Sequence, residues 1–194
     1  KIVRYIVSQR DTGLDFGAIM DEGKIFLGKL AQGAIGEENA HLLGALLVAK
    51  FQQLTIARQQ QARELRRPFF CYIDEFHNFI TPSMAAILSG ARKYKLGLIL
   101  AHQELRQLHG VPEVQSSVIA NPHTRICFRL GDEDARKLAD GFSFFTAEDL
   151  QNLETGEAIA RIGPARSDFN LRTLPFSAVA ADLVDWAPRA QRVV

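Results

Sequence analysis

The chain has 194 residues, of which 47% are hydrophobic and 23% are charged, as in an ordinary soluble globular protein. This composition excludes collagenous, low-complexity and wholly disordered chains, and the length fits one domain with a sizeable core. The chain has 23 Lys and Arg against 22 Asp and Glu, so its formal net charge of +1 argues against nucleic-acid binding by bulk charge alone.

The hydrophobic pattern predicts strands that alternate with helices along the chain. A strand is predicted at 24–30 and a helix from Glu37 to about Arg63, with Glu37 and Glu38 in its first turn. The unalternating apolar run FFCYI, 69–73, is typical of a strand covered on both faces. The later predictions are a helix from Thr81-Pro82 to about 95, a strand at 96–101, a helix near 113–120, a strand at 124–130, a helix at 132–140, a Thr-capped helical turn at 146–153, edge strands at 157–162 and 168–176, and a C-terminal helix and tail over about 175–194.

This order of elements indicates an α/β fold with a mostly parallel sheet and flanking helices. We expect residues 1–194 to form one domain or part of one, since the chain has no internal repeat or linker. No stretch reaches the roughly 18 apolar residues of a membrane span, so we expect no membrane contact from this segment. Cys71 and Cys127 lie in apolar runs and are predicted to be buried free thiols.

The sharpest chemical feature is the pair Asp74-Glu75, which directly follows the apolar run. In an open parallel sheet, ligands bind at the carboxyl ends of the strands. Two carboxylates at this position suit nucleoside-triphosphate hydrolysis, with Asp74 holding Mg²⁺ through water and Glu75 orienting and deprotonating the attacking water. This is the Walker B pattern. The alternative interpretation is an ordinary strand end followed by a helix cap.

A second polar residue, Gln103, follows the next predicted strand, 29 positions after Asp74. That spacing is one strand–helix–strand unit, so the two residues are expected at the same edge of the sheet. A polar side chain there can contact the γ-phosphate and sense its loss. The alternative is a glutamine that only caps the turn.

The segment RPFFCYIDEFHNFITPSMAAILSGARKYKLGLILAHQELRQL, 67–108, resembles the Walker B to sensor segment of the HerA/FtsK superfamily of hexameric ATPases. The segments around it, over roughly residues 10–175, resemble conjugative type IV secretion coupling proteins of the TraG/TraD type. The resemblance implies the C-terminal part of a RecA-like motor domain that uses Mg²⁺ and ATP.

The chain departs from this family in one respect, because it has no phosphate-binding loop of the form G-x-x-x-x-G-K-[ST]. The stretch Gly17-AIMDE-Gly23-Lys24 has five intervening residues in place of four, and Ile25 follows the lysine. In the family this loop lies well upstream of Walker B. We therefore expect Lys1 to follow the loop, and the chain to lack the strand that carries it.

The resemblance also implies roles for single residues. It implies that Asp74 is the Mg²⁺ aspartate, Glu75 the catalytic base and Gln103 the sensor. Arg92 matches a family arginine that can reach the nucleotide of a neighbouring subunit; the alternative is a solvated cation at a helix end. Arg125 and Arg129 are weaker candidates for that arginine.

The remaining polar residues are predicted to have no role in chemistry. The histidines lack metal-ligand spacing and are expected at the surface or in turns: His41, His77, His102, His109 and His123. One group of arginines could touch phosphates, but a solvated helix face is the preferred interpretation: Arg58, Arg63, Arg66 and Arg67.

The preferred hypothesis is part of a hexameric, ATP-driven DNA translocase of the conjugative coupling-protein type. The resemblance implies further copies of the chain, DNA, a relaxase and secretion-channel proteins as partners, at the cytoplasmic face of a bacterial inner membrane. Two alternatives stay open. One is a HerA-like DNA-repair translocase, and the other is a degenerate, non-catalytic module for protein contacts.

Overall fold

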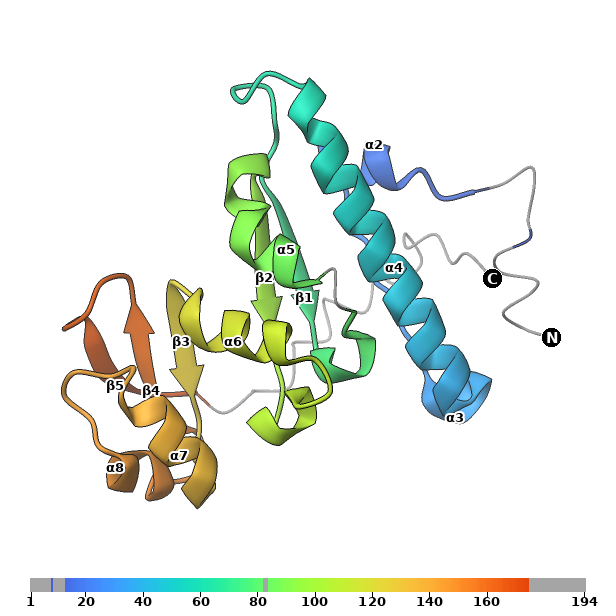
Figure 1. Cartoon of the computed structure of the whole chain (residues 1–194). Coiled ribbons are helices and arrows are strands. Elements are labelled where there is room, and N and C mark those ends of the chain that lie inside the picture. Colours follow the sequence, from blue (N-terminus) through green and yellow to red (C-terminus); the bar gives the residue numbers. More distant parts are fainter. Residues whose placement is uncertain (1–7, 9–12, 82–83, 175–194) are drawn as a thin grey trace. The chain divides into compact units, whose positions relative to one another are not determined.

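The computed structural model describes residue 8 and residues 13–81 and 84–174, which fall into two compact units (Figure 1). The first unit spans residues 1–122 and the second residues 123–194. Each unit is described by itself below. The predicted C-terminal helix and tail at 175–194 lie outside the described residues.

Helices and strands alternate through most of the described chain. The helices are α2 (Phe16–Asp21), α3 (Gln32–Ile35), α4 (Glu37–Ala57), α5 (Met84–Gly90), α6 (Pro112–Ala120), α7 (Asp132–Ala139) and α8 (Ala147–Gln151). Short 3-10 turns are η1 (Arg58–Gln60), η2 (Phe76–Phe79), η3 (Ala91–Tyr94) and η4 (Leu105–Leu108). The strands are β1 (Phe69–Ile73), β2 (Leu96–Leu100), β3 (Thr124–Cys127), β4 (Glu157–Ile162) and β5 (Asp168–Arg172).

The first unit is built on β1 and β2, which pair in parallel from Phe69↔Leu96 to Ile73↔Leu100. The parallel pair and the helix between its strands confirm the predicted α/β fold. Gly97 is the partner of Phe70, and a Cβ on Gly97 would lie 2.5 Å from the Phe70 ring. A side chain at 97 would therefore displace Phe70 and disturb the pairing.

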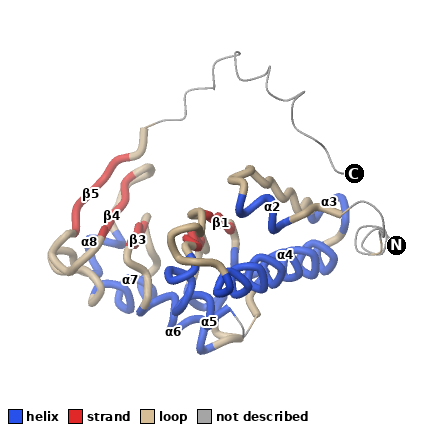
Figure 2. The backbone as a smooth tube through the Cα atoms, turned by 90° about the horizontal axis from the view of Figure 1, so that it is seen from above, coloured by secondary structure: helices blue, strands red, loops and turns tan. Residues whose placement is uncertain are grey.

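Helices α4 and α5 cover the same face of β1, as Figure 2 shows from above. Phe51 of α4 stacks on Phe69 with their ring centroids 5.3 Å apart. Beside them, Ile87 of α5 packs with Ala91 and Leu96 in a core cluster that also contacts Cys71. The apolar character of α5 and of alternate β1 residues thus fixes the strand pair against the helices.

The opposite face of β1 is open in the described part of this unit. Phe70 and Tyr72 are 61% and 75% exposed, whereas Ile73 is buried. The prediction that this strand is covered on both faces is therefore wrong for residues 13–81 and 84–122. The reason is geometric, because α4 and α5 both pack on the face that carries Phe69 and Cys71.

Residues 24–30, predicted as a strand, form no strand in the structure. Phe26 instead joins an aromatic cluster, with its ring centroid 5.4 Å from Phe16 and 5.9 Å from Phe51. Phe26 is half-buried in this cluster, whereas Ile25 and Leu27 are 88% and 74% exposed, so the stretch contributes one aromatic side chain to the packing. Helix α4 begins at Glu37 as predicted but ends at Ala57, with η1 continuing to Gln60.

The second unit contains an antiparallel sheet of order β3-β4-β5. Helices α7 and α8, which lie between β3 and β4 in the sequence, pack against each other. Residues 157–162, predicted as an edge strand, are the central strand of this sheet, and Ala158, Ile159 and Ala160 are buried. The predicted strand at 124–130 is shorter, ending at Cys127. Thr146 caps α8 as predicted, by accepting a hydrogen bond from Asp149 N.

Among the described helices, the stretch Glu37–Gln60 is long and apolar enough to cross a membrane by length and composition alone. This evidence is weak, because the core helix of a soluble protein passes the same test. The helix packs one face on the first unit's core through Leu43, Val48 and Phe51, while Leu42 and Leu46 are exposed.

Candidate functional site

Asp74 and Glu75 lie at the carboxyl end of β1, where the strand turns into η2. Glu75 adopts the left-handed conformation, with φ 47° and ψ 45°. For a residue other than glycine this costs about 1–3 kcal/mol and is often found at functional sites. The Asp74 carboxylate stabilises the turn, since its Oδ1 accepts a hydrogen bond from the Glu75 amide at 3.0 Å.

Gln103 and Glu75 are in direct contact. The Gln103 side-chain amide donates a hydrogen bond from Nε2 to Glu75 Oε1 at 2.6 Å. The backbone brings them together, because Ala101 N donates to Ile73 O and Phe76 N donates to Ala101 O, both at 3.0 Å. Thus the strand pairing of β1 and β2 continues past their ends and places both side chains at one edge.

Gln107, which the sequence did not single out, orients the Gln103 backbone. Gln107 Oε1 accepts hydrogen bonds from Gln103 N at 3.3 Å and from Glu104 N at 3.1 Å. Two leucines of the same turn, Leu105 and Leu108, are almost completely buried and anchor η4. A polar residue four positions after Gln103 is the only sequence signal for this contact.

His77, predicted to have no role, lies beside the second oxygen of Glu75. Its Nδ1 is 3.4 Å from Glu75 Oε2, and its side chain is only 18% exposed. Neither atom has a hydrogen-bond partner among the described residues. Glu75 is thus held by a hydrogen bond at Oε1, while its Oε2 is buried and flanked by the imidazole.

The carboxylate oxygens at this edge suit a magnesium ion held through water. Asp74 is exposed, and the Glu75 amide occupies only one of its two carboxylate oxygens among the described residues. Mg²⁺ usually keeps several waters and binds through one or two carboxylates and substrate phosphates. In the described ranges, no group of three His, Cys, Asp or Glu side chains could hold a metal ion by itself.

Arg92 does not join these residues. It is exposed in η3, directly before β2, whereas Asp74, Glu75 and Gln103 follow the carboxyl ends of the strands. A five-residue strand is about 16 Å long at 3.3 Å per residue, so Arg92 lies at the opposite edge of the strand pair. Arg92 therefore cannot contact the carboxylates of Asp74 and Glu75 in its own chain.

Arg125 and Arg129, the weaker arginine candidates, belong to the second unit. Arg125 lies on β3 opposite Arg161 of β4. Burial lowers the pKa of the Arg125 guanidinium from its ordinary value, and the charge of Arg161 lowers it further. Arg129 is exposed beyond the end of β3.

The glycines of the stretch 17–24 do not form a phosphate-binding loop. Gly17 lies inside α2, and Gly23 forms a left-handed turn with φ 72°. Lys24 pairs with Glu22, with Nζ 2.6 Å from Oε2. This geometry agrees with the spacing, which departs from the phosphate-loop motif by one residue.

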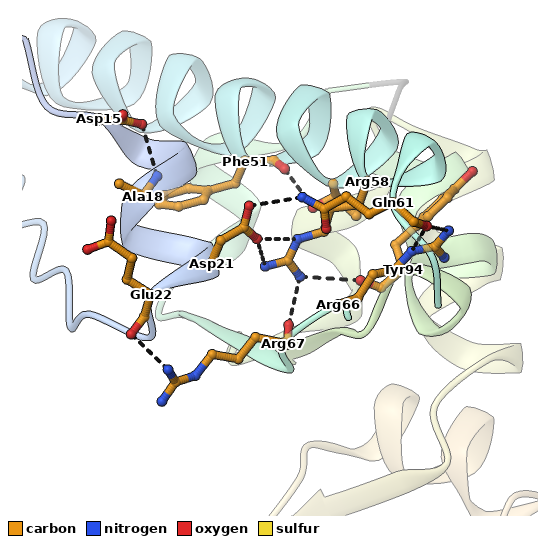
Figure 3. A network of polar contacts seen from close by, with 11 residues as sticks. Asp15, Ala18, Asp21, Glu22, Phe51, Arg58, Gln61, Arg66, Arg67 and Tyr94 are labelled. Carbon is orange, nitrogen blue, oxygen red and sulfur yellow. Dashed lines mark hydrogen bonds and ion pairs between the residues drawn. The ribbon is translucent and has the colours of Figure 1, made fainter. Parts of the chain in front are cut away.

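The prediction of a solvated arginine face is wrong for one of the four arginines. The Arg58 side chain is only 3% exposed and pairs with Asp21 at 2.8 Å, as Figure 3 shows. Arg63 and Arg67 are exposed, as predicted, while Arg66 is half-buried. The sequence could not reveal this, because the partners of Arg58 come from residues 9 to 37 positions away.

Both cysteines are free thiols. Cys127 is buried, as predicted, and burial raises its pKa to about 11. Cys71 is only partly buried, and burial raises its pKa as well. Because the thiolate is the nucleophilic form, these values argue against a catalytic thiol.

Comparison with known protein families finds one match that covers the carboxylate edge. Residues 68–153, which carry β1, Asp74, Glu75, Arg92, β2 and Gln103, match the family model TraG-D_C, described as the TraM recognition site of TraD and TraG. The chain is similar to conjugative coupling proteins. A search of curated proteins finds no match.

Solved structures of coupling proteins and related ATPases share the fold. The bacterial conjugative coupling protein TrwB, without its first 70 residues and unbound, matches 69% of this chain with a TM-score of 0.54 and 16% identity. TrwB in complex with ADP and Mg²⁺ matches 70% with the same TM-score and identity. VirB4 of Thermoanaerobacter pseudethanolicus matches 72% with a TM-score of 0.53 and 16% identity.

This likeness confirms the RecA-like α/β fold and the resemblance to the C-terminal part of such motor domains. The chain spans 37% to 39% of the length of these structures. At 16% identity this likeness shows the fold alone.

Proposed function

We propose that this chain is the C-terminal part of the motor domain of an ATP-driven DNA translocase, of the type that couples conjugative DNA transfer to a type IV secretion system. The family match over residues 68–153 and the shared fold with TrwB support this proposal. The proposal includes assembly into a hexameric ring and action at the cytoplasmic face of a bacterial inner membrane.

The hydrogen bond from Gln103 to Glu75 is the observation that carries the proposal. A glutamine that bonds the proposed base from the neighbouring strand is placed to couple the state of the nucleotide to the base. A γ-phosphate that draws the Gln103 amide toward itself would weaken its bond to Glu75. The carboxylate would then be freer to accept a proton from the attacking water.

In this proposal Glu75 is the general base, Asp74 holds Mg²⁺ through water, and Gln103 is the sensor. The magnesium ion supplies charge neutralisation at the phosphates when it is bound. The left-handed backbone of Glu75 and the adjacent His77 hold the carboxylate in a fixed position, so little reorganisation is needed when ATP arrives.

Arg92 completes the site from a second copy of the chain. Its position at the opposite strand edge excludes contact with Glu75 of the same chain and supports a role in trans. An arginine supplied across a subunit interface stabilises the charge on the transferring phosphoryl group and is worth about 10³–10⁵ in kcat in well-studied phosphoryl-transfer enzymes.

The proposed partners follow from the same similarity. TraG-D_C is described as the TraM recognition site, so we propose that residues 68–153 include a surface that contacts a protein of the transfer machinery. DNA in the ring, a relaxase and secretion-channel proteins are further proposed partners. Binding of the purified chain to such proteins can be measured by calorimetry.

A non-catalytic module for protein contacts is the second candidate, and the absence of G-x-x-x-x-G-K-[ST] from these 194 residues favours it. The two candidates differ in what Glu75→Gln does. In a form of the protein that binds ATP, a motor loses hydrolysis with this variant, whereas a contact module keeps its partner binding and has no hydrolysis to lose.

A further inference from the structure

The turn that carries Arg92 is bound by two arginines, Arg58 and Arg66, which lie in the segment that leads into β1. This turn, η3, precedes β2, and both arginines precede β1. Arg58, at the end of α4, donates from Nη1 to the carbonyl of Tyr94 at 3.3 Å and to the carbonyl of Arg67 at 3.0 Å (Figure 3). One buried guanidinium therefore ties together the two backbone segments that precede β1 and β2.

Arg66 makes the second tie. Its Nη1 donates to the carbonyl of Lys93 at 2.7 Å, while Nε and Nη2 both donate to the carbonyl of Gln61, at 3.1 and 2.7 Å. Its guanidinium also lies 5.7 Å from the centre of the Tyr94 ring. The carbonyls of residues 93 and 94, which directly follow Arg92, are thus each bound by an arginine.

Asp21 supports this arrangement from α2. Its Oδ1 accepts from both Nε and Nη2 of Arg58, at 3.2 and 2.8 Å, and its Oδ2 accepts from Gln61 Nε2 at 3.1 Å. The charge of the buried Arg58 is therefore balanced, and its remaining donors are free to bind carbonyls. A lysine has no planar fork and could not serve several carbonyls in this way.

These contacts fix the backbone around Arg92, whose own side chain is exposed. Arg92 is exposed, and its guanidinium makes no hydrogen bond or ion pair with the residues that the structure describes. An arginine that must reach a site on another subunit gains from a rigid backbone, since a misplacement of about 1 Å can cost about 10²-fold in rate.

We propose that Arg58 and Arg66 are positioning residues for Arg92, and that they hold its turn in place for action across a subunit interface. This inference rests on the proposed trans role of Arg92. It also predicts a rigid turn in the chain alone, which can be measured without any catalytic activity.

The first experiment measures hydrogen exchange of the Lys95 amide, which closes the turn by donating to the Arg92 carbonyl at 3.1 Å. Arg66→Gln should raise this exchange rate by about tenfold or more, as a local opening of the turn would. Arg63→Gln is the matched control, because Arg63 is exposed in the same loop and makes no hydrogen bond with described residues. Equal protection of Lys95 in both variants would overturn the inference.

The second experiment measures turnover in a form of the protein that hydrolyses ATP. Arg66→Gln should lower kcat by about 10- to 100-fold and leave the KM for ATP within about twofold, since each subunit's own nucleotide contacts remain. Arg66→Lys should restore little, while Arg63→Gln should have normal turnover. Normal kcat for Arg66→Gln would overturn the inference even if the turn opens.

Mixing separates positioning from a general loss of structure. Arg66→Gln chains mixed with Glu75→Gln chains should regain part of the activity, because the second chain supplies an intact Arg92 and the first an intact base. Mixing with Arg92→Ala chains should give no recovery, since both chains are defective on the same side of the interface. Recovery with Arg92→Ala would overturn the inference. Normal turnover of Arg92→Ala alone would instead contradict the proposed trans role itself.

Discussion

Glu75 combines features that separately are uncommon. It is a non-glycine residue in the left-handed region, with one carboxylate oxygen bound by Gln103 and the other flanked by His77. The strain of that backbone is offset by the strand pairing on either side of it, through residues 73, 76 and 101. Such a fixed carboxylate suits a general base, which must be positioned before the reaction begins.

Replacing this carboxylate should separate binding from hydrolysis. In a form of the protein that hydrolyses ATP, Glu75→Gln should keep ATP binding and lower kcat by about 10²-fold or more, because an amide cannot accept the proton of water. Asp74→Ala should also weaken the Mg²⁺-dependent part of ATP binding. Fluorescent-nucleotide titration with and without Mg²⁺, together with phosphate release, measures both effects; near-normal turnover of Glu75→Gln would assign the base elsewhere.

The raised pKa of Cys127 predicts a slow and pH-dependent thiol. With a pKa of about 11, the folded Cys127 is almost entirely protonated at pH 8 and its thiolate fraction rises as the pH rises toward 11. Alkylation by iodoacetamide in a Cys71→Ser background should therefore accelerate about tenfold per pH unit between pH 8 and 10. A rate that levels off below pH 9 would contradict the buried position of this thiol.

At the scale of elements, the hydrogen bonds of Arg58 connect α2, the end of α4 and the segments that directly precede β1 and β2. Arg58→Met should destabilise the chain by about 2–4 kcal/mol, because two carbonyls and Asp21 lose a buried donor. Arg63→Met, at an exposed position nearby, should change stability by less than about 0.5 kcal/mol. Urea unfolding followed by circular dichroism measures both, and equal midpoints would argue against a structural role for Arg58.

The elements with strong local signals were predictable. The apolar runs at 69–73 and 96–100 form strands, and Thr146 caps its helix, because each of these features depends on residues close in the chain. The strand predicted at 24–30 is absent, and the half-buried Phe26 contacts aromatic rings of α2 and α4 rather than a neighbouring strand. The central place of β4 depends on which strands pair with it, and alternation alone does not encode that.

The site was predictable in part for the same reason. The contact between Glu75 and Gln103 follows from the parallel order of two strands, which a spacing of one strand–helix–strand unit already indicates. The contacts of His77, Gln107 and Arg58 depend on side-chain directions and on the packing of distant segments. No short sequence motif encodes these, so the structure was needed to find them.

At the scale of the whole molecule, these 194 residues contain the proposed base, sensor and magnesium ligand, without a G-x-x-x-x-G-K-[ST] loop. The backbone amides and lysine of that loop supply most contacts to the β- and γ-phosphates in P-loop ATPases. The purified 194-residue chain should therefore bind and hydrolyse ATP poorly or not at all. Calorimetry and phosphate release test this, and robust Mg²⁺-dependent turnover by this chain would show that another segment replaces the loop.

The central claim is that one chain supplies the base, Glu75, while another supplies Arg92 from the opposite strand edge. The most direct test mixes Arg92→Ala and Glu75→Gln chains, each inactive alone, in a form of the protein that assembles and hydrolyses ATP. The account predicts that the mixture regains part of the activity, because some interfaces then combine an intact base with an intact arginine. An absence of recovery in well-mixed assemblies, or normal turnover of Arg92→Ala alone, would contradict it.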